Sequence, residues 1–377
     1  MNIIPWESEF PISRYLSEKA GSMGVPISGT FELTSRCNFN CKMCYVHEQK
    51  NKEDLKAREL SVSQWMDIAE EAKSQGLLFL LLTGGEAMIR EDFLELYREL
   101  SVMGFRVSIN TNGSLLSEEA LECFRKYPPG RINVSLYGAS EDTYEDLCEV
   151  RAMGRVKKAI HELRQTGIPV RTTMMLTAYN CKDMEAVYRF AKEEDTMIGL
   201  SSYIFPPVRL DGQSCGSNRG RLSAGDAGRY MVQREKLMLS ADEFNRHARW
   251  ALDENKPVPV AQGGGDGLGD PVLCMAGRGS FWITWDGKLR PCGLVTEPEA
   301  DVLIDGFTAA WEKIRQMTGQ IHLPIECKTC KDRELCRVCA AMCQSETGKF
   351  DQRPDYVCRM VEAMKAEYAF QLTDAQL

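Results

Sequence analysis

Three cysteines stand together near the N-terminal end of the chain, at spacings that suit a metal centre. Cys37, Cys41 and Cys44 form the pattern CxxxCxxC in the segment CNFNCKMC. Three thiolates on one short loop can hold three irons of a cubane iron–sulfur cluster, and the fourth iron then lacks a protein ligand. Such an open iron is reactive, unlike a structural zinc whose four positions are filled. A zinc site completed by His47 is the alternative interpretation of these residues.

A second group of cysteines lies in the C-terminal third of the chain. Of the 15 cysteines, eight fall between positions 274 and 358. An odd total with short, clustered spacings does not fit a disulfide framework, and clustered cysteines in a reducing compartment usually bind metal. We therefore expect zinc or iron–sulfur sites there as well. The eight residues are Cys274, Cys292, Cys327, Cys330, Cys336, Cys339, Cys343 and Cys358.

The elements that must position the first cysteine group form a regular alternation of strand and helix. Apolar strand patterns lie at residues 27–34, 78–82, 105–110, 132–136, 170–176 and 198–205. Helical patterns separate them, and Ser61 with Gln64 forms a capping box at the start of the first. Six strand–helix steps over roughly 180 residues predict an α/β fold with a parallel sheet, too few for an eight-stranded barrel. We therefore predict a partial (β/α)6 TIM-like barrel, whose chemistry lies at the carboxyl ends of its strands.

The position of the cysteine loop after the first strand resembles that in the radical S-adenosylmethionine (SAM) enzymes. The six-step α/β unit and the segment Gly84-Gly85-Glu86 at the end of the second strand strengthen this resemblance. It implies a 4Fe–4S cluster whose open iron binds the amino and carboxylate groups of SAM. Reductive cleavage of SAM would then yield a 5′-deoxyadenosyl radical that abstracts a hydrogen atom from the substrate.

The resemblance also implies contacts to SAM at the ends of the early strands. Gly84, Gly85 and Glu86 match the motif that meets the methionine amino group, where glycines admit the backbone and a carboxylate complements an ammonium. Met43 stands where relatives usually carry an aromatic residue, so we expect its backbone to contact the adenine. The other expected positions are Asn110, Asn112, Ser135 and Arg151, with Arg155 as the rival of Arg151 for the methionine carboxylate. A solvated helix charge is the alternative for both arginines.

The C-terminal cysteines resemble the SPASM extension, the auxiliary-cluster domain of peptide-modifying radical SAM enzymes. Their run departs from the usual CxxCx5CxxxC pattern, because Cys339 comes one position early and Cys343 is extra. One implied arrangement is two four-ligand clusters, and in another the second set uses three cysteines and leaves an iron open for substrate. Zinc is the alternative for the CxxC pairs. The implied sets are Cys327, Cys330, Cys336 and Cys358, and Cys274, Cys292, Cys339 and Cys343.

The pattern along the chain predicts five segments. We expect a lead-in over residues 1–27, the radical SAM barrel over 28–205, a connecting or substrate-covering region over 206–269, the SPASM-like domain over 270–360, and a C-terminal helix or tail over 361–377. A helical pattern runs through residues 224–252, and Asp286-Gly287 suggests a type I′ hairpin turn. Cys215, in the polar part of the connecting region, is a candidate hydrogen-atom donor, whereas Cys123, Cys148 and Cys181 fit buried apolar positions.

Composition and charge exclude several classes of protein. The chain is 44% hydrophobic and 27% charged, which is ordinary for a globular protein and excludes wholesale disorder. A net charge of −8 without a basic block argues against a nucleic-acid binder. The longest apolar run, residues 77–82, is too short for a membrane span, and the N-terminus lacks a signal peptide. We therefore expect a cytoplasmic protein without nucleic-acid or membrane partners.

The resemblance implies oxidative modification of a ribosomally made peptide, such as a thioether or carbon–carbon crosslink. We expect an electron donor such as flavodoxin or ferredoxin. Because only 27 residues precede the first strand, we also expect a separate leader-peptide-binding protein or recognition through residues 205–270. The rival activities are tetrapyrrole side-chain modification and sulfatase maturation. Sulfatase maturases carry an aspartate after the cysteine that matches Cys292, and Gly293 at this position counts against that activity. A non-catalytic metal-binding scaffold is the rival from a different class.

Overall fold

Six parallel strands form the centre of the computed structural model, which describes residues 11–45, 52–207, 219–258 and 268–374. Neighbours in the chain are neighbours in the sheet, in the order β6-β5-β4-β3-β2-β1. This arrangement confirms the predicted α/β partial barrel, although β6 ends at Ser201 rather than at residue 205. The strands are β1 (Ser28–Glu32), β2 (Phe79–Thr83), β3 (Arg106–Thr111), β4 (Arg131–Ser135), β5 (Val170–Met175) and β6 (Met197–Ser201).

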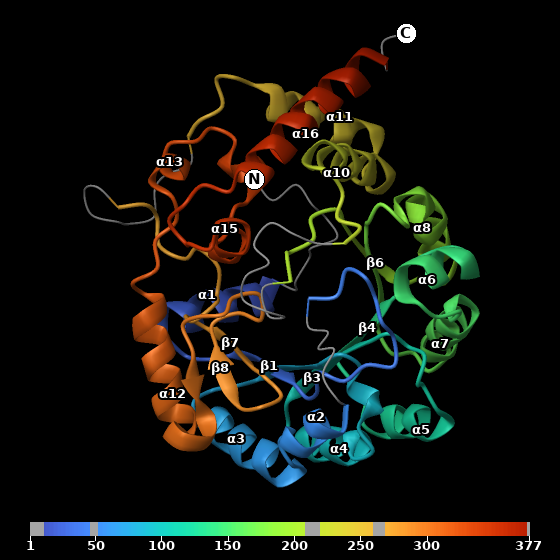
Figure 1. Ribbon diagram of the computed structural model, residues 1–377, viewed down its shortest axis with the longest axis vertical. Coiled ribbons are helices and arrows are strands. Elements are labelled where there is room, and N and C mark those ends of the chain that lie inside the picture. The colour runs from blue at the N-terminus through green and yellow to red at the C-terminus, as the bar shows by residue number, and fades with distance from the viewer. Residues whose placement is uncertain (1–10, 46–51, 208–218, 259–267, 375–377) are drawn as a thin grey trace.

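Helices cover the outer face of these strands and appear as an arc around them in Figure 1. The predicted capping box of α3 is present, since the Ser61 hydroxyl accepts from the Gln64 N–H and the Gln64 side chain accepts from the Ser61 N–H. The helix α6 was not expected from the sequence. The arc consists of α3 (Val62–Ser74), α4 (Phe93–Val102), α5 (Glu118–Lys126), α6 (Glu141–Cys148), α7 (Met153–Gln165) and α8 (Met184–Glu193), with α2 (Lys52–Arg58) nearby.

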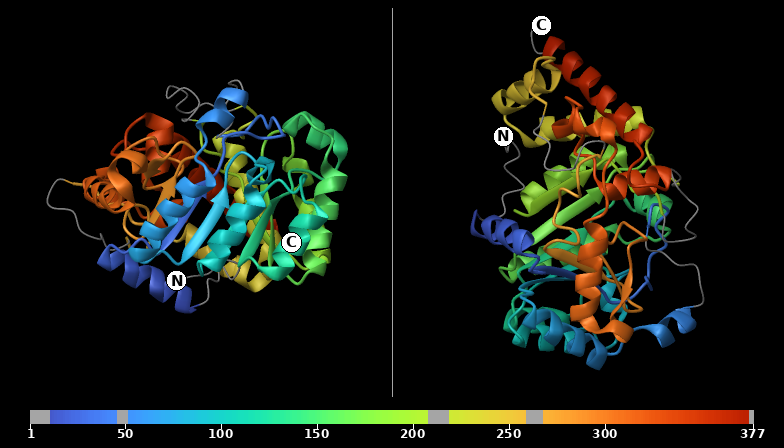
Figure 2. Two further views of the ribbon diagram at one scale, coloured as in Figure 1. Left: turned by 90° about the horizontal axis from the view of Figure 1, so that it is seen from below. Right: turned by 90° about the vertical axis from the view of Figure 1, so that its left-hand side faces the viewer.

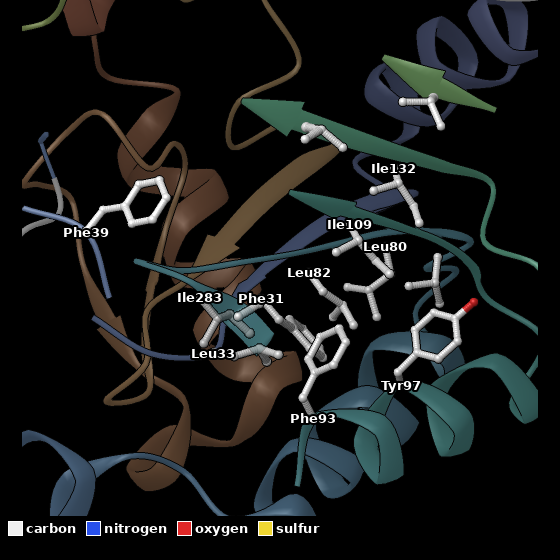
Figure 3. Close-up of a cluster of buried hydrophobic side chains, with 14 of the residues drawn as sticks. Phe31, Leu33, Phe39, Leu80, Leu82, Phe93, Tyr97, Ile109, Ile132 and Ile283 are labelled. Carbon is white, nitrogen blue, oxygen red and sulfur yellow. The ribbon is translucent and has the colours of Figure 1, made fainter. Parts of the chain in front are cut away.

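The main hydrophobic core lies between the sheet and these helices. Figure 3 shows Phe93 and Tyr97 of α4 pointing toward the sheet, where Leu82 of β2 and Ile109 of β3 lie. All four side chains are buried. Alternate residues of each strand therefore face the helices, and the residues between them face the interior of the barrel. Asn110, Asn133 and Arg171 occupy this interior face, whereas Thr172 is buried on the other face, where its hydroxyl contacts that of Thr196.

The C-terminal part adds three strands to the same sheet beyond β1. The strand β7 (Ser280–Ile283) pairs with β1 in parallel, and β8 (Lys288–Arg290) and β9 (Ala300–Asp301) follow in antiparallel order. Figure 2 shows the orange and red C-terminal segments beside the β1 side of the barrel. The predicted type I′ turn is wrong. Its loop spans three residues, and only Gly287 has positive φ, at 86°, as in a loop closed by a glycine bulge.

Further helices surround this core. The predicted helix over 224–252 is interrupted, because the Ser240 hydroxyl accepts from the Glu243 N–H and starts a new helix there. A helix also occupies part of the expected lead-in. These elements are α1 (Pro11–Met23), α10 (Ala224–Met238), α11 (Ala241–Leu252), α12 (Val302–Thr318), α13 (Ile325–Lys328), α14 (Arg333–Cys336), α15 (Ala340–Thr347) and α16 (Asp355–Asp374).

Candidate functional site

A cavity of about 550 Å³ lies at the carboxyl ends of the barrel strands. The cysteine loop after β1 forms one wall, and the interior faces of β2 to β5 form others. This is the edge where the sequence predicts the chemistry. Of the residues expected to hold iron or SAM in the barrel, nine line the cavity: Cys37, Cys41, Met43, Cys44, Gly84, Gly85, Asn110, Asn112 and Ser135.

Hydrogen bonds to two other segments hold the cysteine loop in place. The N–H groups of Asn40 and Lys42 donate to the last carbonyls of α6, those of Cys148 and Leu147, at 3.2 and 2.9 Å. The Asn38 side chain accepts from Asn112 Nδ2 at 2.9 Å and donates to a serine in the loop after β3. The cysteine loop therefore depends on the unexpected helix α6 and on the end of β3.

The three thiols of this loop are close enough to influence one another. Burial raises the pKa of Cys37 to about 12, and the charges of Cys41 and Cys44 add to this increase. The pKa of Cys41 is raised mainly by its hydrogen bond with the Cys148 thiol, and burial is the second cause. The thiols of Cys37 and Cys41 are therefore protonated at neutral pH unless a cation compensates the thiolate charge. Iron supplies that charge, and its binding would release protons.

The two glycines at the end of β2 bring its loop against the loop after β1. The Gly85 N–H donates to the Thr34 carbonyl at 2.8 Å, and the Glu86 N–H donates to the Arg36 carbonyl at 2.9 Å. A Cβ atom at Gly85 would lie 2.4 Å from the Arg36 oxygen, and one at Gly84 would lie 2.5 Å from the Thr34 oxygen. Both contacts are with backbone, which cannot move aside. The glycine pair thus fixes the start of the cysteine loop.

Glu86 lies behind the cavity wall rather than on it. Its carboxylate accepts from the Asn112 N–H at 2.6 Å, the Thr111 hydroxyl at 2.9 Å and the Met88 N–H at 3.1 Å. Burial raises the pKa of Glu86, and the Asn112 and Met88 N–H groups and the Thr111 hydroxyl oppose that shift. In this structure the carboxylate therefore lies at the end of β3, where it holds Asn112.

Arg151 is not brought to the cavity. Its guanidinium forms ion pairs with Asp142 at 3.1 Å and Glu145 at 2.6 Å, and the side chain is 55% exposed. The cause is local, because Glu149 adopts a left-handed conformation at the end of α6 and the chain turns back over that helix. The rival Arg155 is also exposed. Cys215 and His47 lie outside the described residues.

The C-terminal cysteines form two neighbouring groups. Burial raises the pKa of Cys336 to about 12, with contributions from the nearby thiols of Cys327, Cys330 and Cys358. These are the four residues of the first expected cluster. Cys274 similarly contributes to the raised pKa of Cys339. Burial is the main cause of the raised pKa of Cys343, and thiols from both groups add to it. These thiols are Cys327 and Cys336 of the first group and Cys339 of the second.

Cys292 lies near the wall of the barrel cavity. Its Sγ atom accepts from the Leu294 N–H at 3.5 Å, and Leu294 lines the cavity. Within the described ranges, no three His, Cys, Asp or Glu side chains converge as a ready-made metal site.

None of the described helices combines the length and apolar character of a membrane span.

Comparison with known proteins places the cysteine loop and the cavity in one family. Residues 31–191 match the family model of the Radical SAM superfamily. This segment is a radical SAM domain. It uses a 4Fe–4S cluster and SAM, in agreement with the loop of three thiols, and the C-terminal cysteines are consistent with auxiliary clusters.

Relatives of known name cover most of the chain of this radical SAM enzyme. An AdoMet-dependent heme synthase of Methanosarcina barkeri is 26% identical over 86% of this chain and 94% of its own. A probable GTP 3′,8-cyclase of Sulfurisphaera tokodaii is 28% identical over 78% of this chain and 90% of its own. This chain is also similar to the solved structure of anSMEcpe with bound AdoMet and the Cp18Cys peptide, with a TM-score of 0.64 and 16% sequence identity. The match covers 92% of this chain and 98% of the anSMEcpe chain. The last similarity shows the fold alone.

Several residues that shape the radical SAM cavity were missed in the sequence. Arg131 and Asn133 of β4, and Arg171 and Thr173 of β5, line the cavity. The signal for Arg131 and Asn133 is the alternation of polar and apolar residues in RINVS, which marks the polar residues as facing the interior. The segment VRTT of β5 has no such alternation, because Thr172 between Arg171 and Thr173 is also polar. A buried ion network was also missed, in which Glu59 joins Arg36 and Arg90 beneath the cysteine loop.

A Gly85→Ala variant should lose SAM binding and most of the iron of the barrel cluster. The added methyl group would collide with the Arg36 carbonyl and displace the start of the cysteine loop. Iron content after anaerobic reconstitution and calorimetric titration with SAM measure the effect. Gly225→Ala is the matched control, because the nearest atom to its new Cβ lies 3.8 Å away on α10. Normal SAM affinity in Gly85→Ala would show that the close approach of the two loops is not needed.

Proposed function

We propose that this radical SAM enzyme oxidises its substrate, removing one hydrogen atom in the barrel cavity and a further electron through the C-terminal cysteines. The observation that carries the proposal is the position of Cys292, which accepts from the N–H of the cavity residue Leu294. A cluster held in part by Cys292 would lie beside the substrate radical. Transfer of one electron to it, with release of one proton to solvent, would leave a product that lacks two hydrogens.

The residues of the cavity wall provide the cofactor site in this proposal. Cys37, Cys41 and Cys44 would hold three irons, and the bound cluster with SAM supplies the 5′-deoxyadenosyl radical. Backbone groups at Gly84 and Gly85 would receive the methionine end of SAM, and Met43 would contact the adenine through its backbone. Glu86 positions this site through Asn112. The other SAM contacts proposed are Asn110, Asn112 and Ser135.

A ribosomally made peptide is our first candidate substrate. The same architecture, including the C-terminal part, is found in a solved structure with both AdoMet and a peptide bound. Partners in this case would be the peptide, a reductant such as flavodoxin or ferredoxin, and a separate leader-binding protein. Sulfatase maturation is disfavoured, because a Cβ at Gly293 would lie 2.6 Å from the Trp282 ring and leaves no space for an aspartate.

A tetrapyrrole is the second candidate, favoured by the heme synthase that matches 86% of this chain. It is consistent with the same oxidative chemistry, because a propionate side chain of the macrocycle can lose a hydrogen atom and then an electron as carbon dioxide leaves and a carbon–carbon double bond forms. The choice between the candidates rests on which molecule the cavity accepts.

Mass spectrometry of reaction mixtures tests this proposal. The reconstituted enzyme is incubated anaerobically with reductant, SAM and either peptides encoded near its gene or an iron porphyrin with propionate side chains. We expect a peptide product lighter by two hydrogens per event. Conversion of the porphyrin with every peptide untouched would select the second candidate, and conversion of GTP, the substrate class named for other relatives, would contradict both. An unchanged peptide mass with deuterium uptake from heavy water would replace oxidation by epimerisation.

A further inference from the structure

The barrel cavity carries positive charge and no acidic residue. Arg131 and Arg171 are among its lining residues, and none of the lining residues is Asp or Glu. The carboxylate of Glu86 lies behind the wall and is occupied by three donors. Among the described residues, a ligand that enters this cavity therefore meets guanidinium groups and no lining carboxylate, which favours an anionic group.

A row of polar side chains crosses the interior face of four neighbouring strands toward Arg171. Asn110 Nδ2 donates to the Thr83 hydroxyl at 3.3 Å, and Asn133 Nδ2 donates to Asn110 Oδ1 at 2.7 Å. Asn133 is in register with Asn110 on one side and with Arg171 on the other. The Asn133 Oδ1 atom is buried and has no hydrogen-bond partner among the described residues. The row of hydrogen bonds thus stops beside Arg171.

The Arg171 side chain leans toward the carboxyl edge of the sheet. Its register partner on β6 is Met197, but its guanidinium lies over Gly199, two residues further along. A Cβ atom at Gly199 would be 3.0 Å from Arg171 Nε and 3.2 Å from one terminal nitrogen. The absence of a side chain at 199 thus provides the space for the guanidinium. Among the described residues, none forms a hydrogen bond or an ion pair with the Arg171 side chain.

A partly buried guanidinium without a carboxylate partner is costly unless a ligand completes it. Its planar fork matches a carboxylate with two parallel hydrogen bonds. The cysteine loop and the glycine pair, where SAM is proposed to bind, belong to the β1 and β2 side of the barrel. Among the other proposed SAM contacts, Asn110 shares the register of Arg171 but lies two strands away, about 10 Å at the usual spacing of about 4.8 Å per strand. Ser135 on the neighbouring strand is in register with Thr173, two residues nearer the carboxyl edge than Arg171. This separation favours the substrate over the SAM carboxylate as the ligand.

We propose that the guanidinium of Arg171 forms an oxyanion subsite that binds a carboxylate of the substrate within the radical cavity. The subsite rests on the proposed oxidative function and adds a requirement to it. The substrate must carry a carboxylate near the carbon that loses hydrogen. An acidic side chain of a peptide and a propionate of a tetrapyrrole both meet this requirement.

Paired probes test the subsite and identify the source of the carboxylate. One pair is a porphyrin with free propionates and its methyl ester, and the other is an Asp- and Glu-containing peptide and its Asn and Gln counterpart. Each is titrated into the cluster-loaded, SAM-bound enzyme. One acidic probe should bind about 10- to 100-fold more tightly than its neutral partner, the range for charge-assisted hydrogen bonds. In Arg171→Gln this preference should vanish, and in Arg171→Lys part of it should remain.

Two further variants and one cofactor measurement control this test. Gly199→Ala should weaken binding of the acidic probe, because its methyl group displaces the guanidinium. Arg106→Gln makes the same charge change on β3 at an exposed position outside the cavity and should behave as wild type. The affinity for SAM, measured by calorimetry, should be unchanged in Arg171→Gln.

The possible results separate this subsite from the oxidative function. Equal binding of acidic and neutral probes to the wild type would overturn the subsite, as would an acid preference that survives in Arg171→Gln. A tenfold loss of SAM affinity in Arg171→Gln would assign the guanidinium to the cofactor and also overturn it. The oxidative function fails separately, if the reduced wild-type enzyme cleaves SAM but oxidises no substrate that it binds.

Discussion

A variant with Cys37, Cys41 and Cys44 all replaced by alanine will lose reductive cleavage of SAM completely. These thiols line the cavity on one loop, and each thiolate is expected to hold one iron. Without the cluster there is no site for electron transfer to SAM. If three cubane clusters form, iron should fall from about twelve to about eight atoms per chain. Iron analysis and chromatographic detection of 5′-deoxyadenosine after reduction measure the two effects.

The control for this variant is Cys123→Ala. Cys123 lies on α5, and its position on the outer arc separates it from the expected cluster ligands. Its loss should leave iron content and SAM cleavage unchanged. Circular dichroism should show intact secondary structure in both variants, since the loop backbone is held by α6 and Asn112. Continued SAM cleavage by the triple variant would refute the assignment of the barrel cluster.

Replacing Cys327 and Cys330 together will separate SAM cleavage from substrate oxidation. Both thiols raise the pKa of Cys336, so the three lie in one group near Cys358. Their removal should eliminate about four irons and leave the barrel cluster in place. In our account 5′-deoxyadenosine still forms, but oxidised product does not, because the second electron has no acceptor. The ratio of the two products, measured by mass spectrometry, reports this uncoupling.

Two outcomes would contradict this second prediction. Zinc in place of iron at these positions in the wild type would remove the auxiliary-cluster interpretation. Full product formation by the double variant would show that oxidation does not use this group. The comparison is Cys181→Ala, because Cys181 lies in the short 3-10 helix that precedes α8, outside both C-terminal groups.

The barrel and its cysteine loop could be predicted because their signals are local. The CxxxCxxC pattern, the glycine pair and six apolar strands each occupy a few consecutive residues. The strand β7 gave a local hairpin signal, but its pairing with β1 joins residues about 250 positions apart, such as Ser28 and Ser280. Nothing in either segment specifies the other, so the continuous nine-stranded sheet was not foreseen.

The positions of charged side chains in the site were the least predictable. Glu86 satisfies three donors at the end of β3, which depends on where β3 ends relative to β2. Arg151 was expected at the cavity but pairs with two carboxylates of α6, a helix that the sequence analysis had not identified. Arg171 was overlooked because a single arginine in a strand has no distinctive pattern. Its importance follows from Gly199 on the neighbouring strand, and that relation exists only in the fold.

The most direct test of the account is X-ray diffraction from anaerobic crystals of the reconstituted protein with SAM, measured at the iron and zinc edges. We predict a four-iron cluster bound by Cys37, Cys41 and Cys44, with SAM on its open iron in the 550 Å³ cavity beside Gly84 and Gly85. A single tetrahedral zinc at this loop, with no SAM in the cavity, would contradict the account.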